Sequence, residues 1–261
     1  MLLAIDVGNT NTVFAIIEGN TTLESWRCST YTARTSDEYY VWLEPLIGLK
    51  ASIEDIESVI ISSVVPGVLF NLEQLCQKYF DTEPIIVGTG NCRLPVEVRI
   101  DPGVHVGSDR LVNTVSAFDQ FGGDLIVVDF GTATTFDVVD NDGAYIGGVI
   151  SPGIDLSLRA LHEAAAALPH VGVEIPPSII GKNTLDCMHS GIFWGYVSLV
   201  EGICKRIQEE QGRDLKVIGT GGYSTVLAQA DHLFDKLDED LTIHGLAIIY
   251  NYNAFGTNDQ A

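Results

Sequence analysis

Residues 2–18 read LLAIDVGNTNTVFAIIE, and residues 125–140 read LIVVDFGTATTFDVVD. Each stretch has a short apolar run, then Asp-x-Gly, then a turn rich in Asn or Thr, then a second apolar run. Three positions coincide at a constant separation of 123 residues: Asp6 with Asp129, Gly8 with Gly131 and Thr12 with Thr135. This separation is about half the chain, which predicts two halves that are built alike.

Each stretch predicts a β-hairpin, because a glycine turn separates two apolar runs of strand length. Other apolar runs predict strands at 59–65, 84–88 and 216–222. Helical spacing predicts helices at 68–80, from Ser108 onward, and at 157–168, 190–211 and 247–252. Strands and helices alternate in both halves, so the expected class is α/β. We expect two similar lobes, 1–120 and 121–261, with a cleft between them.

The composition excludes several classes of function. The 261-residue chain is 46% hydrophobic, which excludes a disordered protein. Its formal net charge is −21 and it has no Lys/Arg cluster, which argues against nucleic acid or an anionic membrane as a partner. Five scattered cysteines with no CxxC pair fit neither a disulfide framework nor a zinc knuckle. The N-terminus has no basic leader, so the expected location is the cytoplasm.

The turn from Asp6 to Thr12 predicts a phosphate site. Successive backbone N–H groups and hydroxyls at a tight bend bind phosphate oxygens, and an acid at the strand end binds Mg²⁺ directly or through water. A polar hairpin turn without ligand explains a single copy equally well. The matched second copy at Asp129 favours phosphate binding, because two-lobed nucleotide folds have one phosphate clamp in each lobe.

Two further strings allow both a structural and a functional interpretation. In Gly107-Ser108-Asp109-Arg110, Ser108 fits a helix N-cap, and an acid in the first turn complements the helix dipole. The alternative is a carboxylate that accepts a hydroxyl proton beside a guanidinium that holds an anion. Residues 219–222 read GTGG after a strand, which is typical of a helix start as well as of a ligand loop.

The two hairpins and the late glycine loop together resemble the actin/hexokinase/Hsp70 superfamily, a ribonuclease H-like fold. In that superfamily the hairpins of both lobes bracket the nucleotide phosphates, and a late Gly-Gly loop meets the adenosine. Neither a Walker A motif nor GxGxxG occurs, which argues against P-loop and Rossmann folds.

The order of motifs sharpens the resemblance. The strings DVGNTNTVF, GSDRLVN, DFGTATTFDVV, GGVISPG and GKNTLDCMHSGIFWGY resemble type III pantothenate kinases, the Bvg accessory factor group, over nearly the whole chain. The resemblance implies ATP-dependent phosphorylation of pantothenate to 4'-phosphopantothenate, the first step of coenzyme A biosynthesis. It also implies a homodimer.

The resemblance implies specific residue roles. ATP phosphates lie along Asp6, Val7, Gly8, Asn9, Thr10, Asn11, Thr12 and Val13, with a further nucleotide contact at Thr132. Pantothenate lies along Gly107, Ser108, Asp109 and Arg110, and Asp109 is the catalytic base. A monovalent cation, K⁺ or NH₄⁺, is held at Asp129. Thr184 helps to close the pantothenate site across the dimer interface.

The chain departs from the family pattern at two places. Many members have Ala where Ser108 stands, and a small hydroxyl there should be tolerated. Many members also have a Tyr shortly before this motif, where this chain reads VRIDP at 98–102, so no substrate role is assigned to that segment.

Three alternatives to a pantothenate kinase remain at this stage. Another small-molecule kinase of the superfamily would keep both hairpins and use a different acceptor. A nucleotide-gated chaperone would need a peptide-binding domain, for which no residues are left over. A non-catalytic regulatory protein would bind nucleotide without turnover, but the presence of both Asp6 and Asp109 argues against it.

Overall fold

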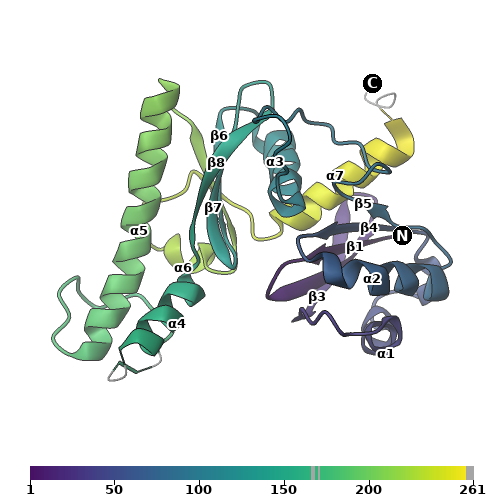
Figure 1. Ribbon diagram of the computed structural model, residues 1–261, viewed down its shortest axis with the longest axis horizontal. Coiled ribbons are helices and arrows are strands. Elements are labelled where there is room, and N and C mark those ends of the chain that lie inside the picture. Colours follow the sequence, from purple (N-terminus) through teal and green to yellow (C-terminus); the bar gives the residue numbers. More distant parts are fainter. Residues whose placement is uncertain (166–167, 170, 257–261) are drawn as a thin grey trace. The chain divides into compact units, whose positions relative to one another are not determined.

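The computed structural model describes residues 1–165, 168–169 and 171–256 (Figure 1). The chain forms two compact units. Unit 1 comprises Met1–Glu97, Asp101–Gln120 and the segment that begins at Leu241; unit 2 comprises Val98–Ile100 and Phe121–Asp240. Relative to the expected lobes 1–120 and 121–261, segment 98–100 groups with unit 2 and the C-terminal helix groups with unit 1.

Unit 1 is built on a five-stranded mixed sheet. Its strands are β1 (Leu2–Val7), β2 (Asn11–Glu18), β3 (Thr21–Ser29), β4 (Ser58–Ser63) and β5 (Ile85–Ile86). They lie in the order β3-β2-β1-β4-β5. The first three strands form an antiparallel meander, and β4 and β5 add in parallel on the other side of β1.

Unit 2 repeats this sheet. Its strands are β6 (Leu125–Phe130), β7 (Ala133–Val139), β8 (Tyr145–Pro152), β9 (Lys216–Gly221) and β10 (Lys236–Leu237). Their order, β10-β9-β6-β7-β8, is that of unit 1 with each strand replaced by its counterpart. The predicted internal repeat is therefore confirmed at the level of strand order and direction.

The register corrects one detail of the repeat. Val7 pairs with Thr12 across the first hairpin, whereas Phe130 pairs with Thr134 across the second. The second turn is therefore one residue shorter, and Thr12 corresponds to Thr134 and not to Thr135. Both of these threonines are fully buried, which agrees with the corrected alignment.

The helices connect and cover the sheets. They are α1 (Ser36–Ile47), α2 (Pro66–Tyr79), α3 (Ser108–Phe121), α4 (Ile154–Ala164), α5 (Thr184–Gln211), α6 (Ser224–Leu227) and α7 (Leu241–Phe255). The helices expected at 157–168, 190–211 and 247–252 begin earlier than predicted, at Ile154, Thr184 and Leu241, and the first of them ends earlier, at Ala164. Residues 166 and 167 of the first prediction lie outside the described part of the chain.

The two faces of the unit 1 sheet bury different helices. Side chains of β1 alternate, so Leu3 and Ile5 pack in the cluster with α1 and α2, and Leu2 and Ala4 pack in the cluster with α3 and α7. Each face is thus covered by two helices, and the sheet forms the central layer of the unit.

Helices α3 and α7 approach each other closely. A Cβ added to Gly245 of α7 would overlap the backbone carbonyl oxygen of Val112 of α3. The hydroxyl of Thr242 also donates to Asn113 Oδ1 at 2.7 Å. These contacts fix α3 against α7, and both helices pack on the same face of the sheet.

The described part of the chain contains no helix that is both long enough and apolar enough to cross a lipid bilayer.

Candidate active site

Asp6 lies near the end of β1, on the face of the sheet that α3 and α7 cover. The register places Val13 of β2 and Ser62 of β4 directly beside it. Since neighbouring residues in register point to the same face of a sheet, the Ser62 side chain lies next to the Asp6 carboxyl. The closeness of the Ser62 hydroxyl favours the ionised form of this carboxyl and so acts to lower its pKa.

The first turn of α3 brings Asp109 to the same place. Ser108 begins the helix, and its Oγ lies 3.0 Å from Oγ of Ser62. The hydroxyl of Ser108 is therefore bound to β4, and the predicted N-cap role for Ser108 is wrong. Asp109 follows directly, and its Oδ1 accepts a hydrogen bond from the backbone N–H of Arg110 at 2.8 Å.

The two carboxyl groups influence each other. Burial raises the pKa of Asp6 to about 7, the negative charge of Asp109 adds to this rise, and the Ser62 hydroxyl and the Arg27 guanidinium oppose it. Burial also raises the pKa of Asp109, against the backbone N–H and the positive charge of Arg110. Oδ1 of Asp6 is buried and has no hydrogen-bond partner. Unit 1 thus holds two acidic groups in a poorly solvated place, and Oδ1 of Asp6 has no hydrogen-bond partner there.

Gly107 leaves room for the Asp109 carboxylate. A Cβ at Gly107 would lie 2.5 Å from Oδ1 of Asp109 and 3.5 Å from a methyl carbon of Val64. A larger residue at position 107 would therefore displace the Asp109 carboxylate, because this side chain can rotate away from the added carbon.

The predicted phosphate turn contains exposed and buried residues. The exposed part is Asn9, Thr10 and Asn11. Val7 and Thr12 are buried, and Val13 pairs within the sheet. The side chains at the exposed tip and the half-buried Asp6 can face a ligand, whereas those of Val7 and Thr12 cannot.

The turn is held by hydrogen bonds, one of which involves a residue that the sequence did not single out. The backbone N–H of Gly8 donates to the Asn11 carbonyl at 3.0 Å. The Thr30 hydroxyl donates to the Gly8 carbonyl at 2.7 Å and lies 2.9 Å from the Thr12 hydroxyl. Thr30 lies just beyond β3, and no local motif distinguishes it in the sequence.

Ser62 was also missed. It follows the apolar residues 59–61, in the same way that Asp6 follows the apolar residues of β1. A polar residue at the end of a buried parallel strand is a signal that sequence analysis can use, because such strand ends meet at one edge of the sheet.

Unit 2 presents the corresponding acid, Asp129, near the end of β6. Its neighbours in register are Thr135 of β7 and Thr220 of β9. Gly221 has φ +85°, and a Cβ there would overlap Oδ1 of Asp129. Gly219, Thr220 and Gly221 of the GTGG string are the last residues of β9 and not a loop after it. The glycine at 221 makes room for this carboxylate, which gives the string a structural reason.

The remaining predicted residues also lie in unit 2. Thr132 lies exposed in the turn after β6, where the N–H of Gly131 donates to the Ala133 carbonyl at 3.0 Å. A Cβ at Gly153 would overlap the carbonyl oxygen of Thr132, so this turn packs directly on the start of α4. Thr184 is the first residue of α5 and is exposed.

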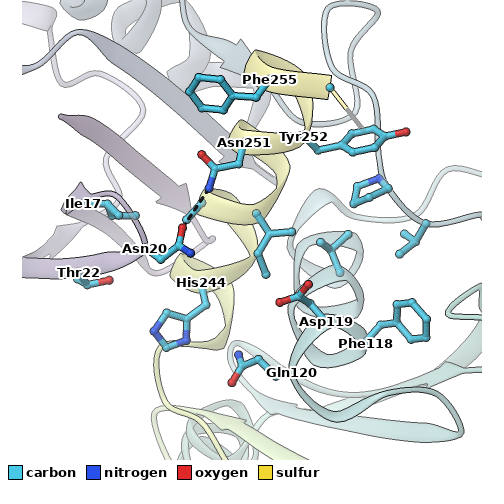
Figure 2. A pocket seen from close by; sticks show the side chains of 16 residues that line it. Ile17, Asn20, Thr22, Phe118, Asp119, Gln120, His244, Asn251, Tyr252 and Phe255 are labelled. Atoms are coloured by element: carbon cyan, nitrogen blue, oxygen red, sulfur yellow. Dashed lines mark hydrogen bonds between the residues drawn. The ribbon is translucent and has the colours of Figure 1, made fainter. Parts of the chain in front are cut away.

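A pocket of about 1000 Å³ in unit 1 lies elsewhere (Figure 2). It is formed by the turn after β2, the last turns of α3 and one side of α7, where Asn251 donates to Asn20 Oδ1 at 3.3 Å. None of the predicted site residues lines it, and its described lining contains one carboxylate, Asp119, and no Lys or Arg. This lining does not suit a phosphate, so the pocket is not the candidate active site.

Among the described residues, no three His, Cys, Asp or Glu side chains converge on a point that would suit a protein-only metal site. A Mg²⁺ ion that binds together with phosphates needs only one or two protein carboxylates. The unpartnered Oδ1 of Asp6 fits such an ion.

Comparison with known proteins identifies related chains. The family model for type III pantothenate kinases matches residues 2–206. A type III pantothenate kinase of Roseobacter denitrificans is 59% identical over 253 residues, which cover 97% of this chain and 98% of the relative.

Solved structures with low sequence identity share the fold. A Baf family protein from Campylobacter jejuni has a TM-score of 0.61 at 20% identity, and the match covers 96% of this chain and 98% of that one. The activator of 2-hydroxyisocaproyl-CoA dehydratase from Clostridium difficile, with bound ADPNP, has a TM-score of 0.54 at 12% identity, with 97% and 95% covered. The expected two lobes of the actin/hexokinase type are therefore confirmed.

The raised pKa of Asp6 predicts a pH-dependent cost to stability. The folded protein holds this proton more tightly than the unfolded chain does, so ionisation destabilises the fold as the pH rises from about 4 to about 7. In the absence of Mg²⁺, Asp6→Asn should therefore gain stability over the wild type by about 1–2 kcal/mol more at pH 8 than at pH 5.5. Urea unfolding of both proteins at the two pH values measures this difference.

Asp119→Asn, at the exposed end of α3, matches the change in net charge. A stability difference between Asp6→Asn and the wild type that stays constant or shrinks toward pH 8 contradicts the buried, proton-holding state of Asp6.

Proposed function

The chain belongs to the type III pantothenate kinase family and uses ATP to phosphorylate pantothenate in coenzyme A biosynthesis, and we propose that the Asp6–Asp109 pair of unit 1 carries the chemistry. The observation that supports this assignment is that two half-buried carboxyls with raised pKa values lie near each other at the end of β1, one on a strand and one on a helix N-terminus. Phosphoryl transfer needs mainly positioning and charge stabilisation, and such a pair supplies both together with a base.

Asp109 is the general base. The primary hydroxyl of pantothenate attacks the γ-phosphorus of ATP, its proton passes to the Asp109 carboxylate, and the bond from the γ-phosphorus to the bridging oxygen breaks to release ADP. Burial raises the pKa of this carboxyl, which brings it closer to the working pH and makes it a stronger base. Arg110, next in the chain, holds the pantothenate carboxylate.

Asp6 and the exposed tip of its turn serve the phosphates. The backbone N–H groups of Asn9, Thr10 and Asn11 bind phosphate oxygens. Asp6 holds Mg²⁺, directly or through water, by its unpartnered Oδ1. When bound, Mg²⁺ neutralises phosphate charge that a protein of net charge −21 does not otherwise offset.

Unit 2 has proposed ligand-binding residues of its own. Thr132 contacts the nucleotide, and Asp129 holds a monovalent cation, K⁺ or NH₄⁺. A carboxylate against glycine backbone and the buried Thr220 hydroxyl offers the oxygen ligands that a hard cation prefers. The Gly219–Gly222 segment meets the adenosine.

The active form is a homodimer. Among the described residues of unit 2, large apolar side chains are exposed on β8, α4 and the start of α5: Ile150 at 64%, Leu156 at 43%, Leu161 at 39% and Leu185 at 48%. A second copy of the chain would cover such a surface. Thr184, beside Leu185, then completes the pantothenate site of the partner subunit. The reaction takes place in the cytoplasm, which agrees with the five free cysteines.

Asp109→Asn tests the catalytic assignment. The amide cannot accept the hydroxyl proton but keeps the size of the side chain, so kcat for pantothenate-dependent ADP release should fall by about 10²–10⁴-fold. Pantothenate and ATP should still bind. Asp119→Asn, on the same helix and outside the proposed site, should keep wild-type activity, and an Asp109→Asn enzyme with wild-type kcat would remove Asp109 from this role.

Gly107→Ala tests the positioning of the same carboxylate. The added Cβ displaces Oδ1 of Asp109, a mobile group, so kcat should fall at least tenfold while the unfolding free energy changes by about 1 kcal/mol or less. Steady-state kinetics and urea unfolding measure the two effects. Gly90→Ala, where nothing lies within 4 Å of the new Cβ, is the matched control. Full activity of Gly107→Ala would show that the carboxylate position seen in the structure is not the one used.

A further inference from the structure

Two buried hydroxyls below the carboxyl pair have no part in the mechanism derived above. Ser62 on β4 is fully buried and Ser108 at the start of α3 is 7% exposed. Their Oγ atoms lie 3.0 Å apart, although 46 residues separate them in the chain. This pair of hydroxyls joins the end of β4 to the start of α3, next to Asp6 and Asp109. Buried polar groups are expected to have a structural or functional role.

The direction of the hydrogen bonds follows from counting protons. Each serine hydroxyl has one proton to donate. Ser62 pairs in register with Asp6 on the same face of the sheet, so its hydroxyl lies where it can donate to the Asp6 carboxylate. With the Ser62 proton given to the carboxylate, Oγ of Ser62 is left as an acceptor, and Ser108 is then the donor between the two serines. The order is Ser108 to Ser62 to Asp6.

The chain of bonds constrains one oxygen of Asp6 and leaves the other free. Oδ1 of Asp6 is buried without a partner, so the oxygen that the neighbouring Ser62 hydroxyl can hold is the other one. A carboxylate held by one oxygen cannot rotate about its Cβ–Cγ bond without breaking that hydrogen bond. The free oxygen is therefore held in one direction.

We propose that Ser108 and Ser62 are positioning residues that aim the free oxygen of Asp6 at Mg²⁺·ATP and tie it to the helix that carries the base Asp109. The inference rests on the proposed function of Asp6 and extends it to two residues of this chain. The Ser108 part is particular to sequences with a hydroxyl there, since the family that this chain resembles often has Ala at this position.

The proposal predicts a selective kinetic effect. Ser62→Ala removes the donor to Asp6, and loss of a hydrogen bond to a charged group should raise the KM for Mg²⁺·ATP about tenfold. Ser108→Ala removes only the bond to Ser62 and should raise this KM about threefold. The KM for pantothenate should change by less than about twofold in both variants, because the Ser108 hydroxyl is bound to Ser62 and a substrate along this segment would meet the backbone of residue 108. A general loss of structure would affect both substrates.

The double variant tests whether the two serines act in series. Ser62→Ala/Ser108→Ala should match Ser62→Ala alone, because Ser108 acts only through Ser62. Ser58→Ala is the matched control: it lies on the same strand and face, and its hydroxyl contacts Tyr250 at 2.8 Å instead of Asp6. This control should leave both KM values unchanged.

The experiment is steady-state kinetics of wild type, the two single variants, the double variant and Ser58→Ala, with Mg²⁺·ATP and pantothenate varied in turn. Any of three results would overturn the proposal. The KM for Mg²⁺·ATP could stay unchanged in both serine variants, or KM could rise equally for the two substrates. The third is a double variant in which the KM effects of the two single variants add. If Ser62→Ala does not fold, Ser108→Ala decides by the same KM comparison.

Asp6→Asn in the same assay separates this proposal from the function on which it rests. If Asp6→Asn weakens Mg²⁺·ATP and the serine variants do not, the positioning role alone is wrong. If Asp6→Asn leaves the KM for Mg²⁺·ATP unchanged, the role of Asp6 is wrong, and the positioning role falls with it.

Discussion

The parallel pairing of β1 with β4 is the contact on which the active site of unit 1 depends. It sets Asp6 in register with Ser62, and Ser62 in turn meets the first residue of α3. A shift of this pairing by one residue would turn Ser62 to the opposite face of the sheet. Asp6, Ser62 and, through Ser108, the start of the helix that carries Asp109 are thus placed by one strand pair.

The same arrangement recurs in unit 2 with different residues. Asp129 holds the place of Asp6, and Thr220, 2% exposed, holds the place of Ser62. The glycine after Thr220 has a positive φ and makes room for the carboxylate. An acid beside a buried hydroxyl at a parallel strand pair is therefore the structural unit that the chain repeats, and each copy has acquired its own surroundings.

Much of this could be read from the sequence, because the repeated acidic hairpin is local. Composition, the two Asp-x-Gly turns and the order of motifs predicted the α/β class, the duplication and the family. The one-residue difference between the turns was not visible, since the residues after both glycines are similar small polar residues. Thr30 and Ser62 were missed because their importance comes from contacts with Gly8 and Asp6, far away in the chain. The assignment of α7 to unit 1 likewise depends on packing, through the close approach of Gly245 to α3.

The central claim is that Asp109 receives the proton of pantothenate while Asp6 serves the phosphates. The most direct measurement is a crystal structure of the protein with pantothenate, Mg²⁺ and a non-hydrolysable ATP analogue, and within it the distance from the primary hydroxyl oxygen of pantothenate to the nearest carboxylate oxygen of Asp109. The account predicts a hydrogen-bond distance of about 2.6–3.2 Å, or one bridging water. A pantothenate hydroxyl that faces another group, with Asp109 too far away for a direct hydrogen bond or for one bridging water, would contradict the account.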